Sequence, residues 1–272
     1  MAGPYLSFLT DFGSDTAPAV CRGVILSILP DARINDLTHA SRPFAVRDAA
    51  FLLWTAIPYL PVGVHLAVVD PGVGTDRRPI AIESARGDRF VGPDNGLLVP
   101  AAERTGGIVA AHALENRSLW REGVSHTFHG RDIFAPVAAR LAAGTALAEV
   151  GPAIDSAALV RVGFAEASPR DGGLDSRVLF VDAFGNCRLA GQPDDLAALR
   201  GGRLEPGDRF VVRAGASATE IAWQPTFGLA APGDLLLYED ADLAGLGIAI
   251  NQGSAAERLG LANDMPIRIE PT

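Results

Sequence analysis

Apolar and polar positions follow two different periods through the first half of the chain. Apolar residues recurring every three or four positions predict helices, whereas short apolar runs bounded by turn residues predict strands. On this basis we expect strands at 5–10, 33–37, 64–69, 79–83, 88–91 and 108–113, and helices at 17–29, 44–57, 97–104 and 132–142. Strands that alternate with helices predict an α/β sandwich domain whose sheet is largely parallel.

The pattern changes after a polar segment rich in turn residues, FAEASPRDGG at 164–173. The rest of the chain carries short strand-like runs at 177–182, 209–214, 219–223, 234–239, 247–251 and 266–270. Short strands separated by turns predict a small β-barrel or sandwich. We therefore expect an N-terminal α/β domain over 1–162, a linker over 163–176 and a smaller C-terminal β domain over 177–272.

The composition restricts the chemistry that the chain can perform. Its 272 residues carry a net charge of −9, and all 23 basic residues are arginine. Without a lysine, the chain cannot form a Schiff base with a substrate or build a Walker-A phosphate loop. The acidic balance also argues against a nucleic-acid partner, which would favour a basic face.

The sequence predicts a cytoplasmic protein that does not enter the membrane. No apolar run approaches the ~18 residues needed to span a bilayer. The N-terminus, MAGPYLSFLTDFG, lacks the basic flank of a signal peptide. The two cysteines, Cys21 and Cys187, fit neither a disulfide framework nor a zinc site, so a reducing compartment is expected.

Apolar strands that end in an acid give the first candidate site residues. Asp11, Asp70 and Asp182 each follow such a run, and ligands of open α/β sheets lie beyond the carboxyl ends of strands. The alternative is that each of them only caps a helix or forms an Asx turn. Asp70 also opens the tight loop DPGVGTDRR, which contains Arg77 and whose alternative interpretation is a solvated surface turn.

Two further segments carry polar and aromatic side chains near turns. In SHTFHGRD, His126 and His129 are three residues apart, a spacing that is weak evidence for a metal site without a further acid. His129, beside a glycine and a helix start, is the better candidate for polarising water or holding a carboxylate. In VDAFGNCRL, Phe184 and Asn186 could stack on and hydrogen-bond a heterocycle, or the segment could be a simple hairpin.

With these segments in place, the chain resembles the S-adenosyl-L-methionine hydroxide adenosyltransferases, the hydrolytic relatives of the fluorinase and chlorinase enzymes. The resemblance runs in order through SFLTDFG, VCRGVI, VVDPGVGTDRRPIA, VGPDNGLL, TFHGRDIF, VDAFGN and IAINQGSAA. It implies an N-terminal α/β domain joined to a C-terminal β-barrel. It also implies a homotrimer in which S-adenosyl-L-methionine lies between the N-terminal domain of one subunit and the C-terminal domain of the next.

The resemblance implies a hydrolase that converts S-adenosyl-L-methionine and water to adenosine and L-methionine by in-line attack at C5′. Its catalytic set falls on Asp70, Arg77 and His129, and no metal or other cofactor is implied. The positions that hold a halide in the halogenating relatives are Asp70, Val73 and Gly130 here. A desolvated carboxylate at that place disfavours a halide by several kcal/mol, so we expect hydroxide to be the nucleophile.

The substrate-binding residues follow from the same resemblance. They are Asp11 for the ribose hydroxyls, Phe44 and Phe227 around ribose and adenine, Phe184 and Asn186 at adenine, Asp182 at the substrate ammonium, and Asn251 and Gln252 beside adenine. One segment departs from the family: residues 238–247, YEDADLAGLG, lack the serine or arginine that usually meets the methionine carboxylate.

Three alternative functions remain open from the sequence. A chlorinase-like enzyme would transfer the adenosyl group to a halide. A non-catalytic protein that binds S-adenosyl-L-methionine or adenosine is kept open by the altered 238–247 segment, because fold does not imply function. A metal-dependent hydrolase built on His126 and His129 is the weakest alternative, since its ligand set is incomplete.

Overall fold

The computed structural model describes residues 3–241 and 245–272. The chain divides into two compact units, Met1–Gly163 and Phe164–Thr272. The segment 163–176, which its polar composition predicted to be a linker, is in part paired strand: β7 (Ser168–Arg170) pairs with β8 (Gly173–Val181).

The first unit is built on a six-stranded sheet in the order β2-β1-β3-β5-β4-β6. The strands are β1 (Tyr5–Thr10), β2 (Arg33–Thr38), β3 (Val64–Val68), β4 (Pro79–Ser84), β5 (Arg89–Pro93) and β6 (Ile108–Ala113). Strands β2, β1, β3 and β5 pair in parallel, whereas β4 pairs antiparallel with both β5 and β6. The largely parallel sheet expected from the sequence is confirmed.

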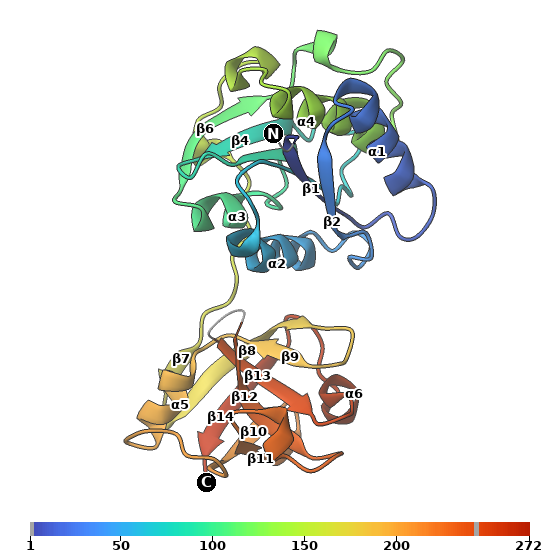
Figure 1. Cartoon of the computed structure of the whole chain (residues 1–272). Helices are drawn as coiled ribbons and strands as arrows, with labels where there is room; N and C mark the ends of the chain where they lie inside the picture. The colour runs from blue at the N-terminus through green and yellow to red at the C-terminus, as the bar shows by residue number, and fades with distance from the viewer. Residues whose placement is uncertain (1–2, 242–244) are drawn as a thin grey trace. The chain divides into compact units, whose positions relative to one another are not determined.

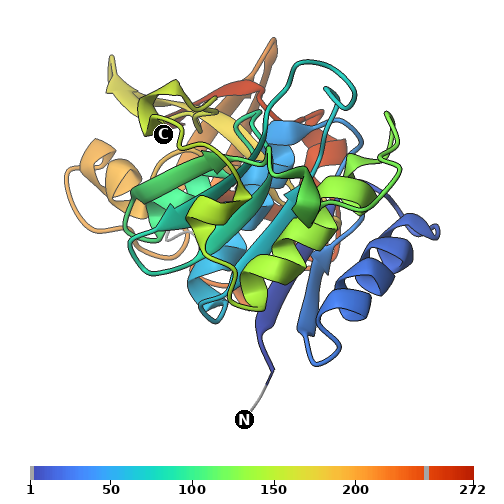
Figure 2. The same ribbon diagram turned by 90° about the horizontal axis from the view of Figure 1, so that it is seen from above.

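Helices cover both faces of this sheet. They are α1 (Ala17–Ile28), α2 (Val46–Ala56), α3 (Val99–Arg104) and α4 (Ala135–Ala142), with a π-helical turn at Gly130–Phe134 directly before α4. Short 3-10 turns lie at Ile57–Tyr59, Arg117–Leu119, Leu147–Val150 and Ser156–Ala158. Figure 1 shows α1 and α4 over one face and α2 and α3 over the other, and Figure 2 shows α1 and α4 side by side.

The core beneath α1 and α4 is formed by alternate residues of the central strands. Leu6 and Phe8 on β1 and Leu66 on β3 are at most 1% exposed and pack in one cluster with Ile25 and Phe134 from the helical layer. Full burial of one such side chain stabilises the fold by about 1.5–3 kcal/mol. This packing fixes the directions of β1 and β3, whose carboxyl ends carry the candidate site.

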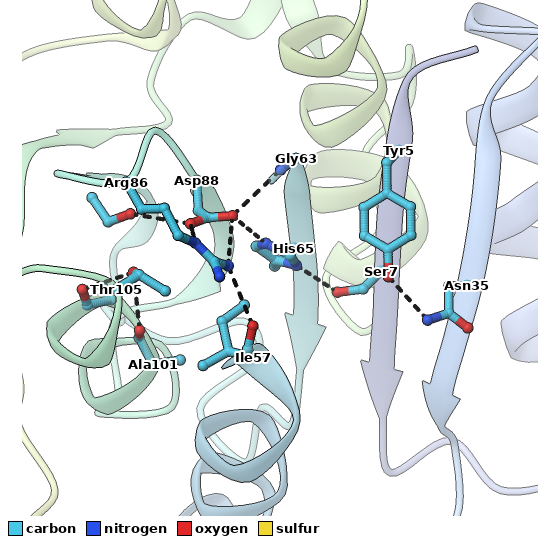
Figure 3. A network of polar contacts seen from close by, with 12 residues as sticks. Tyr5, Ser7, Asn35, Ile57, Gly63, His65, Arg86, Asp88, Ala101 and Thr105 are labelled. Carbon is cyan, nitrogen blue, oxygen red and sulfur yellow. Dashed lines mark hydrogen bonds and ion pairs between the residues drawn. The ribbon is translucent and has the colours of Figure 1, made fainter. Parts of the chain in front are cut away.

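The residues between these apolar positions point to the opposite face and include a buried polar network (Figure 3). Ser7 on β1 and His65 on β3 are register partners, with 2.8 Å between the serine Oγ and the imidazole Nδ1. The other ring nitrogen lies 2.9 Å from Asp88 Oδ1, and Arg86 forms an ion pair with the same carboxylate. Ser7, His65 and Asp88 are at most 1% exposed, so each polar group is buried together with a partner.

The second unit is a closed β-barrel with one additional strand. Its ring runs β14-β10-β11-β12-β13-β9-β8 and closes through pairing of β14 with β8, while β7 extends β8. Besides β7 and β8, the strands are β9 (Cys187–Leu189), β10 (Arg209–Ala214), β11 (Ser217–Trp223), β12 (Leu235–Asp240), β13 (Gly245–Ile250) and β14 (Pro266–Pro271). The helices are α5 (Pro193–Leu199) and α6 (Ala255–Leu259), with a 3-10 turn at Phe227–Leu229. The smaller barrel domain expected from the resemblance is confirmed.

Within the described ranges, every helix is too short or too polar to cross a bilayer.

Candidate functional site

A cavity of about 260 Å³ opens in the first unit beyond the carboxyl ends of β1 and β3. These strands are parallel neighbours, so the residues that follow them meet at one edge of the sheet. The lining comes from the segment after β1, from the last residue of β3 and the loop after it, from the loop before α2, and from the loop and the π-helical turn before α4: Asp11, Phe12, Pro43, Phe44, Val68, Asp70, Val73, Thr127, Phe128, His129 and Gly130.

Asp70 is held by a bidentate hydrogen-bonded contact with Arg77. The guanidinium Nε donates to Asp70 Oδ1 at 3.0 Å, and Nη2 donates to Oδ2. The side chains of Asp70 and Arg77 are only 6% and 8% exposed, which makes this a desolvated ion pair with matched planar geometry. Arg77 also lies over the ring of Phe134, with its central carbon 5.2 Å from the ring centre. The loop 70–78 is thus a turn with exposed residues at 71 and 74–76, but the two charges at Asp70 and Arg77 are paired and shielded from solvent.

His129 is the third member of this cluster. Arg77 Nη2 lies 3.2 Å from His129 Nδ1. A guanidinium can only donate, so we assign Nδ1 as the acceptor and place the ring proton on Nε2. Burial, and then the charge of Arg77, lower the pKa of His129, and these effects outweigh the opposing charges of Asp70 and Asp132. His129 is therefore neutral at neutral pH and has one N–H left to donate.

The structure thus brings the three predicted catalytic residues together, but in two layers. Asp70 and His129 line the cavity, whereas Arg77 lies behind them and contacts both. Arg77 orders the two groups that face the cavity.

The loop that carries His129 is anchored by a buried acid that the sequence reasoning did not select. Asp132 accepts hydrogen bonds from Arg121 at 3.0 Å, from Arg131 at 2.7 Å and from the Ser125 amide at 2.9 Å. Burial alone would raise the pKa of Asp132, but the hydrogen bonds from Arg131 and Ser125 outweigh burial and lower it. The position of Asp132, directly after an arginine at a helix start, was the available sequence signal.

Asp11 and Phe44 meet on the other side of the cavity. The Phe44 amide donates to Asp11 Oδ2 at 2.9 Å, and Phe44 has a φ of +64° with 73% of its surface exposed. A bulky residue in the left-handed region is strained, and such strain concentrates at functional sites. Phe12 and Phe128, also missed by the sequence reasoning, add an edge-to-face aromatic pair with ring centres 5.7 Å apart.

His126 lies outside the cavity lining. Its carbonyl oxygen is 2.6 Å from the place where a Cβ on Gly74 would lie, and Gly74 has a φ of +79°. The loop 70–78 and the loop before α4 therefore touch backbone to backbone at this point. In the part of the chain that the structure describes, no three His, Cys, Asp or Glu side chains are arranged to hold a metal ion.

In the second unit, Asp182 organises the turn between β8 and β9. Its Oδ1 accepts from the amides of Phe184 and Asn186 at 2.8 and 2.9 Å, and its Oδ2 accepts from the Asn186 side-chain amide at 2.9 Å. The hairpin interpretation of this segment is therefore correct as a description of its local structure. The turn also presents the ring of Phe184, which is 79% exposed, so it is compatible with ligand binding.

The other candidate residues of this unit lie on segments connected to that turn. Ala256 donates from its amide to the Gly185 carbonyl at 2.9 Å, which joins the turn to the segment containing Asn251 and Gln252. Asn251 Nδ2 donates to the Ala230 carbonyl at 2.7 Å, next to the 3-10 turn that begins at Phe227. One edge of the barrel thus carries all six predicted binding positions of this unit. Of the divergent segment 238–247, residues 242–244 lie outside the described residues.

Known proteins resemble both units of the chain. Residues 6–151 match the family described as SAM hydroxide adenosyltransferase N-terminal domain, and residues 176–268 match its C-terminal domain. A protein of Salinispora tropica named (R)-S-adenosyl-L-methionine hydrolase is 45% identical, over 98% of this chain and 97% of the relative. A Thermus thermophilus protein of the same name is 39% identical, over 96% and 98%.

More distant relatives and a solved structure extend the comparison. A protein of Actinopolyspora mzabensis named fluorinase is 27% identical, over 98% of this chain and 97% of the relative. The crystal structure of an uncharacterized conserved protein from Thermotoga maritima is 36% identical, covers 97% of this chain and 99% of its own, and superposes with a TM-score of 0.89.

Proposed function

The chain belongs to the S-adenosyl-L-methionine hydroxide adenosyltransferase family, and we propose that it hydrolyses S-adenosyl-L-methionine to adenosine and L-methionine. Relatives that carry the hydrolase name are 39–45% identical over nearly the whole chain. The observation that carries the proposal is the buried cluster in which Arg77 contacts both Asp70 and His129 at the edge of the cavity.

In the proposed reaction, a water oxygen attacks the ribose C5′ carbon in line with the bond to sulfur, and methionine leaves as a neutral thioether. The sulfonium needs no protonation to leave, so the protein has to act on the nucleophile. His129 donates from Nε2 to the attacking oxygen and stabilises its hydroxide character. Asp70 accepts the proton that the water loses, through a lone pair that Arg77 does not use, and releases it to solvent.

The cavity lining supports water over halide as the source of the nucleophile, because water enters as a neutral molecule and loses its proton only during the attack. The Asp70 carboxylate lines the cavity and repels an anion. A Cβ on Gly130 would lie 2.9 Å from the Phe12 ring, so this position has no room for the hydroxyl-bearing side chain of a halide site. Val73, at the remaining halide position, has an apolar side chain without a hydroxyl.

For substrate binding, Asp11 accepts hydrogen bonds from the ribose hydroxyls, and Phe44 contacts the sugar. Phe184, Asn186, Phe227, Asn251 and Gln252 enclose adenine, and Asp182 pairs with the ammonium group. We assign the first two residues and the barrel residues to neighbouring subunits of a homotrimer. The exposure of Phe44 and Phe184 supports this assignment, since 73% and 79% of their surfaces lack cover within the single chain.

The proposed enzyme acts in the cytoplasm and uses no metal or other cofactor, because carboxylate, guanidinium and imidazole groups perform every step. Full activity in excess chelator is therefore expected. The two cysteines, Cys21 and Cys187, are both buried as free thiols, which suits a reducing compartment.

Incubation of the protein with S-adenosyl-L-methionine in water labelled with heavy oxygen tests the proposal. The label should appear in the 5′-hydroxyl of adenosine, and added chloride should give no 5′-chloro product. A halogenated nucleoside would indicate a halide transferase instead. Binding without turnover over hours would indicate a non-catalytic binding protein.

A further inference from the structure

The turn Pro93-Asp94-Asn95 belongs to a segment, VGPDNGLL, that the proposed reaction does not use. It begins at the last residue of β5, and in the sheet β5 lies between β3 and β4. The loop 69–78, which is the loop 70–78 together with Val69, carries the chain from the end of β3 to the start of β4. It must therefore pass across the end of β5, where this turn lies.

Asn95 holds the first residue of that loop. Its side-chain Nδ2 donates to the Val69 carbonyl oxygen at 2.8 Å, one residue before Asp70. Its Oδ1 accepts from the Leu97 amide at 3.2 Å, so the asparagine side chain is fixed at both ends. A side-chain amide suits this place because its donor and acceptor are separate atoms that reach two backbone groups at once.

Asp94 holds the last residue of the loop. Its amide donates to the Arg78 carbonyl at 2.9 Å, and Arg78 Nε donates back to Asp94 Oδ2 at 3.0 Å. The other carboxylate oxygen accepts from the Val160 amide at 2.9 Å. The Asp94 side chain is 2% exposed, so this ion pair is largely shielded from water on the acid side. Arg78 directly follows Arg77 in the chain.

We infer that Asp94 and Asn95 are positioning residues that hold the two ends of loop 69–78, so that Arg77 stays within reach of both Asp70 and His129. The inference rests on the proposed function. The backbone hydrogen bonds inside the loop are local, from Val73 to Asp70 and from Thr75 to Gly72, and they do not fix the loop on the sheet. A displacement of about 1 Å in a reacting group lowers a rate by up to about 100-fold.

The test compares Asn95→Ser with Asn116→Ser. Serine at 95 can still accept from the Leu97 amide but is too short to reach Val69. Asn116 provides a matched control, because its Nδ2 donates to the Glu149 carbonyl at 2.8 Å and its Oδ1 accepts from the Ser118 amide at 3.2 Å. Both asparagines are half-buried in the first unit, and Asn116 lies outside the cavity lining.

We expect Asn95→Ser to lower kcat by about 10- to 100-fold while the Kd for adenosine stays within about twofold. Asn116→Ser should leave both unchanged. An unchanged kcat in Asn95→Ser, or equal losses in the two variants, would overturn the inference. Should Asn95→Ser fail to fold, Asp94→Asn keeps the acceptor for Val160 but weakens the pair with Arg78, and the same selective loss of kcat is expected.

A second measurement separates this inference from the proposed function. Nuclear magnetic resonance titration of His129 reports the position of Arg77 without any turnover, since the nearby guanidinium lowers the pKa of the imidazole. The pKa of His129 should rise in Asn95→Ser and stay unchanged in Asn116→Ser. An unchanged pKa in Asn95→Ser would overturn the inference, whereas a wild-type protein that forms no adenosine would overturn the proposed function alone.

Discussion

Arg77 Nη2 lies 3.2 Å from Nδ1 of His129, and the same guanidinium holds both oxygens of Asp70. One cation therefore fixes the ring proton of the histidine on Nε2 and orients the carboxylate through two contacts. The first three predictions follow from this arrangement.

Replacement of His129 removes the donor that stabilises the attacking oxygen. His129→Ala should lower kcat by about 100- to 1000-fold, as the loss of one oriented donor does in other enzymes. Binding of adenosine, measured by calorimetry, should persist. His126→Ala is the control, because His126 lies outside the cavity lining, and near wild-type turnover is expected from it. Wild-type turnover in His129→Ala would rule out the donor role.

Removal of either partner of the Asp70–Arg77 pair leaves the other charge buried and unpaired. Asp70→Asn and Arg77→Met should each lower the free energy of unfolding by about 3–5 kcal/mol. The double variant should lose less than the sum of the two single losses, because no unpaired charge remains. Urea unfolding of the four proteins measures this coupling. Additive losses would show that the contact contributes nothing as a pair. All three variants should lose most, but not all, of their activity.

The pH dependence of turnover should follow His129. Activity requires the neutral ring, because a proton on Nδ1 would face the guanidinium of Arg77. Burial and Arg77 lower the pKa of His129, so kcat should stay level through neutral pH and fall only on the acid side of the ordinary histidine value of about 6.5. A pH–rate profile measures this limb. In Arg77→Met the residual activity should begin to fall at a higher pH than in the wild type. A fall of the wild-type kcat that begins above pH 7 would contradict the assignment to His129.

Much of the architecture follows from periodicity alone. The strands predicted at 108–113 and 209–214 have the bounds observed for β6 and β10. Asp11 and Asp70 could be placed together because parallel neighbours end at one edge of a sheet. Short elements were missed: α5 spans 7 residues and β9 spans 3, too few to show a period.

The layering of the site could not be predicted from the sequence. The resemblance points to Arg77, but its place behind Asp70 and His129 depends on how loop 69–78 crosses the sheet. Asp94 and Asn95 act on that loop from a different strand end, through contacts with Val69 and Arg78 that no local pattern reveals. The turn at Asp182 shows a related limit, since its hydrogen bonds are those of a hairpin turn and neither require nor exclude a bound ligand.

The buried network around His65 predicts a pH-dependent stability (Figure 3). Burial lowers the pKa of His65 and outweighs the opposing effect of Asp88, so the ring is neutral in the fold. Below the unfolded value of about 6.5 the unfolded chain binds a proton that the native state does not, and the free energy of unfolding should fall as the pH decreases. Desolvation opposes ionisation of Asp88, but its bonds to His65 and Arg86 lower its pKa to about 2, so Asp88 stays charged in this range.

The control for this effect is a side chain that keeps the contacts but does not titrate. His65→Gln retains one donor and one acceptor toward Asp88 and Ser7. Urea unfolding at pH 7 and pH 5 should show a smaller difference for His65→Gln than for the wild type. Equal differences would assign the pH dependence to other groups, such as His129, whose pKa is lowered as well.

Phe44 combines strain with exposure, which predicts opposite effects on stability and binding. Its φ of +64° places an aromatic residue in the left-handed region, at a penalty of roughly 1–2 kcal/mol. Because 73% of its surface is exposed, truncation removes little buried area, and the entropy penalty of glycine is about 0.5–1 kcal/mol. Phe44→Gly should therefore leave the free energy of unfolding unchanged or higher. It should weaken adenosine binding by about tenfold, or ~1.4 kcal/mol, through loss of the ring. Asp171→Gly, at a φ of +46° on the barrel surface, should have a smaller effect on stability, because aspartate tolerates the left-handed region better than phenylalanine does, and it should not change binding. A clear fall in stability of Phe44→Gly would show that the ring is held by packing and not by its role at the cavity.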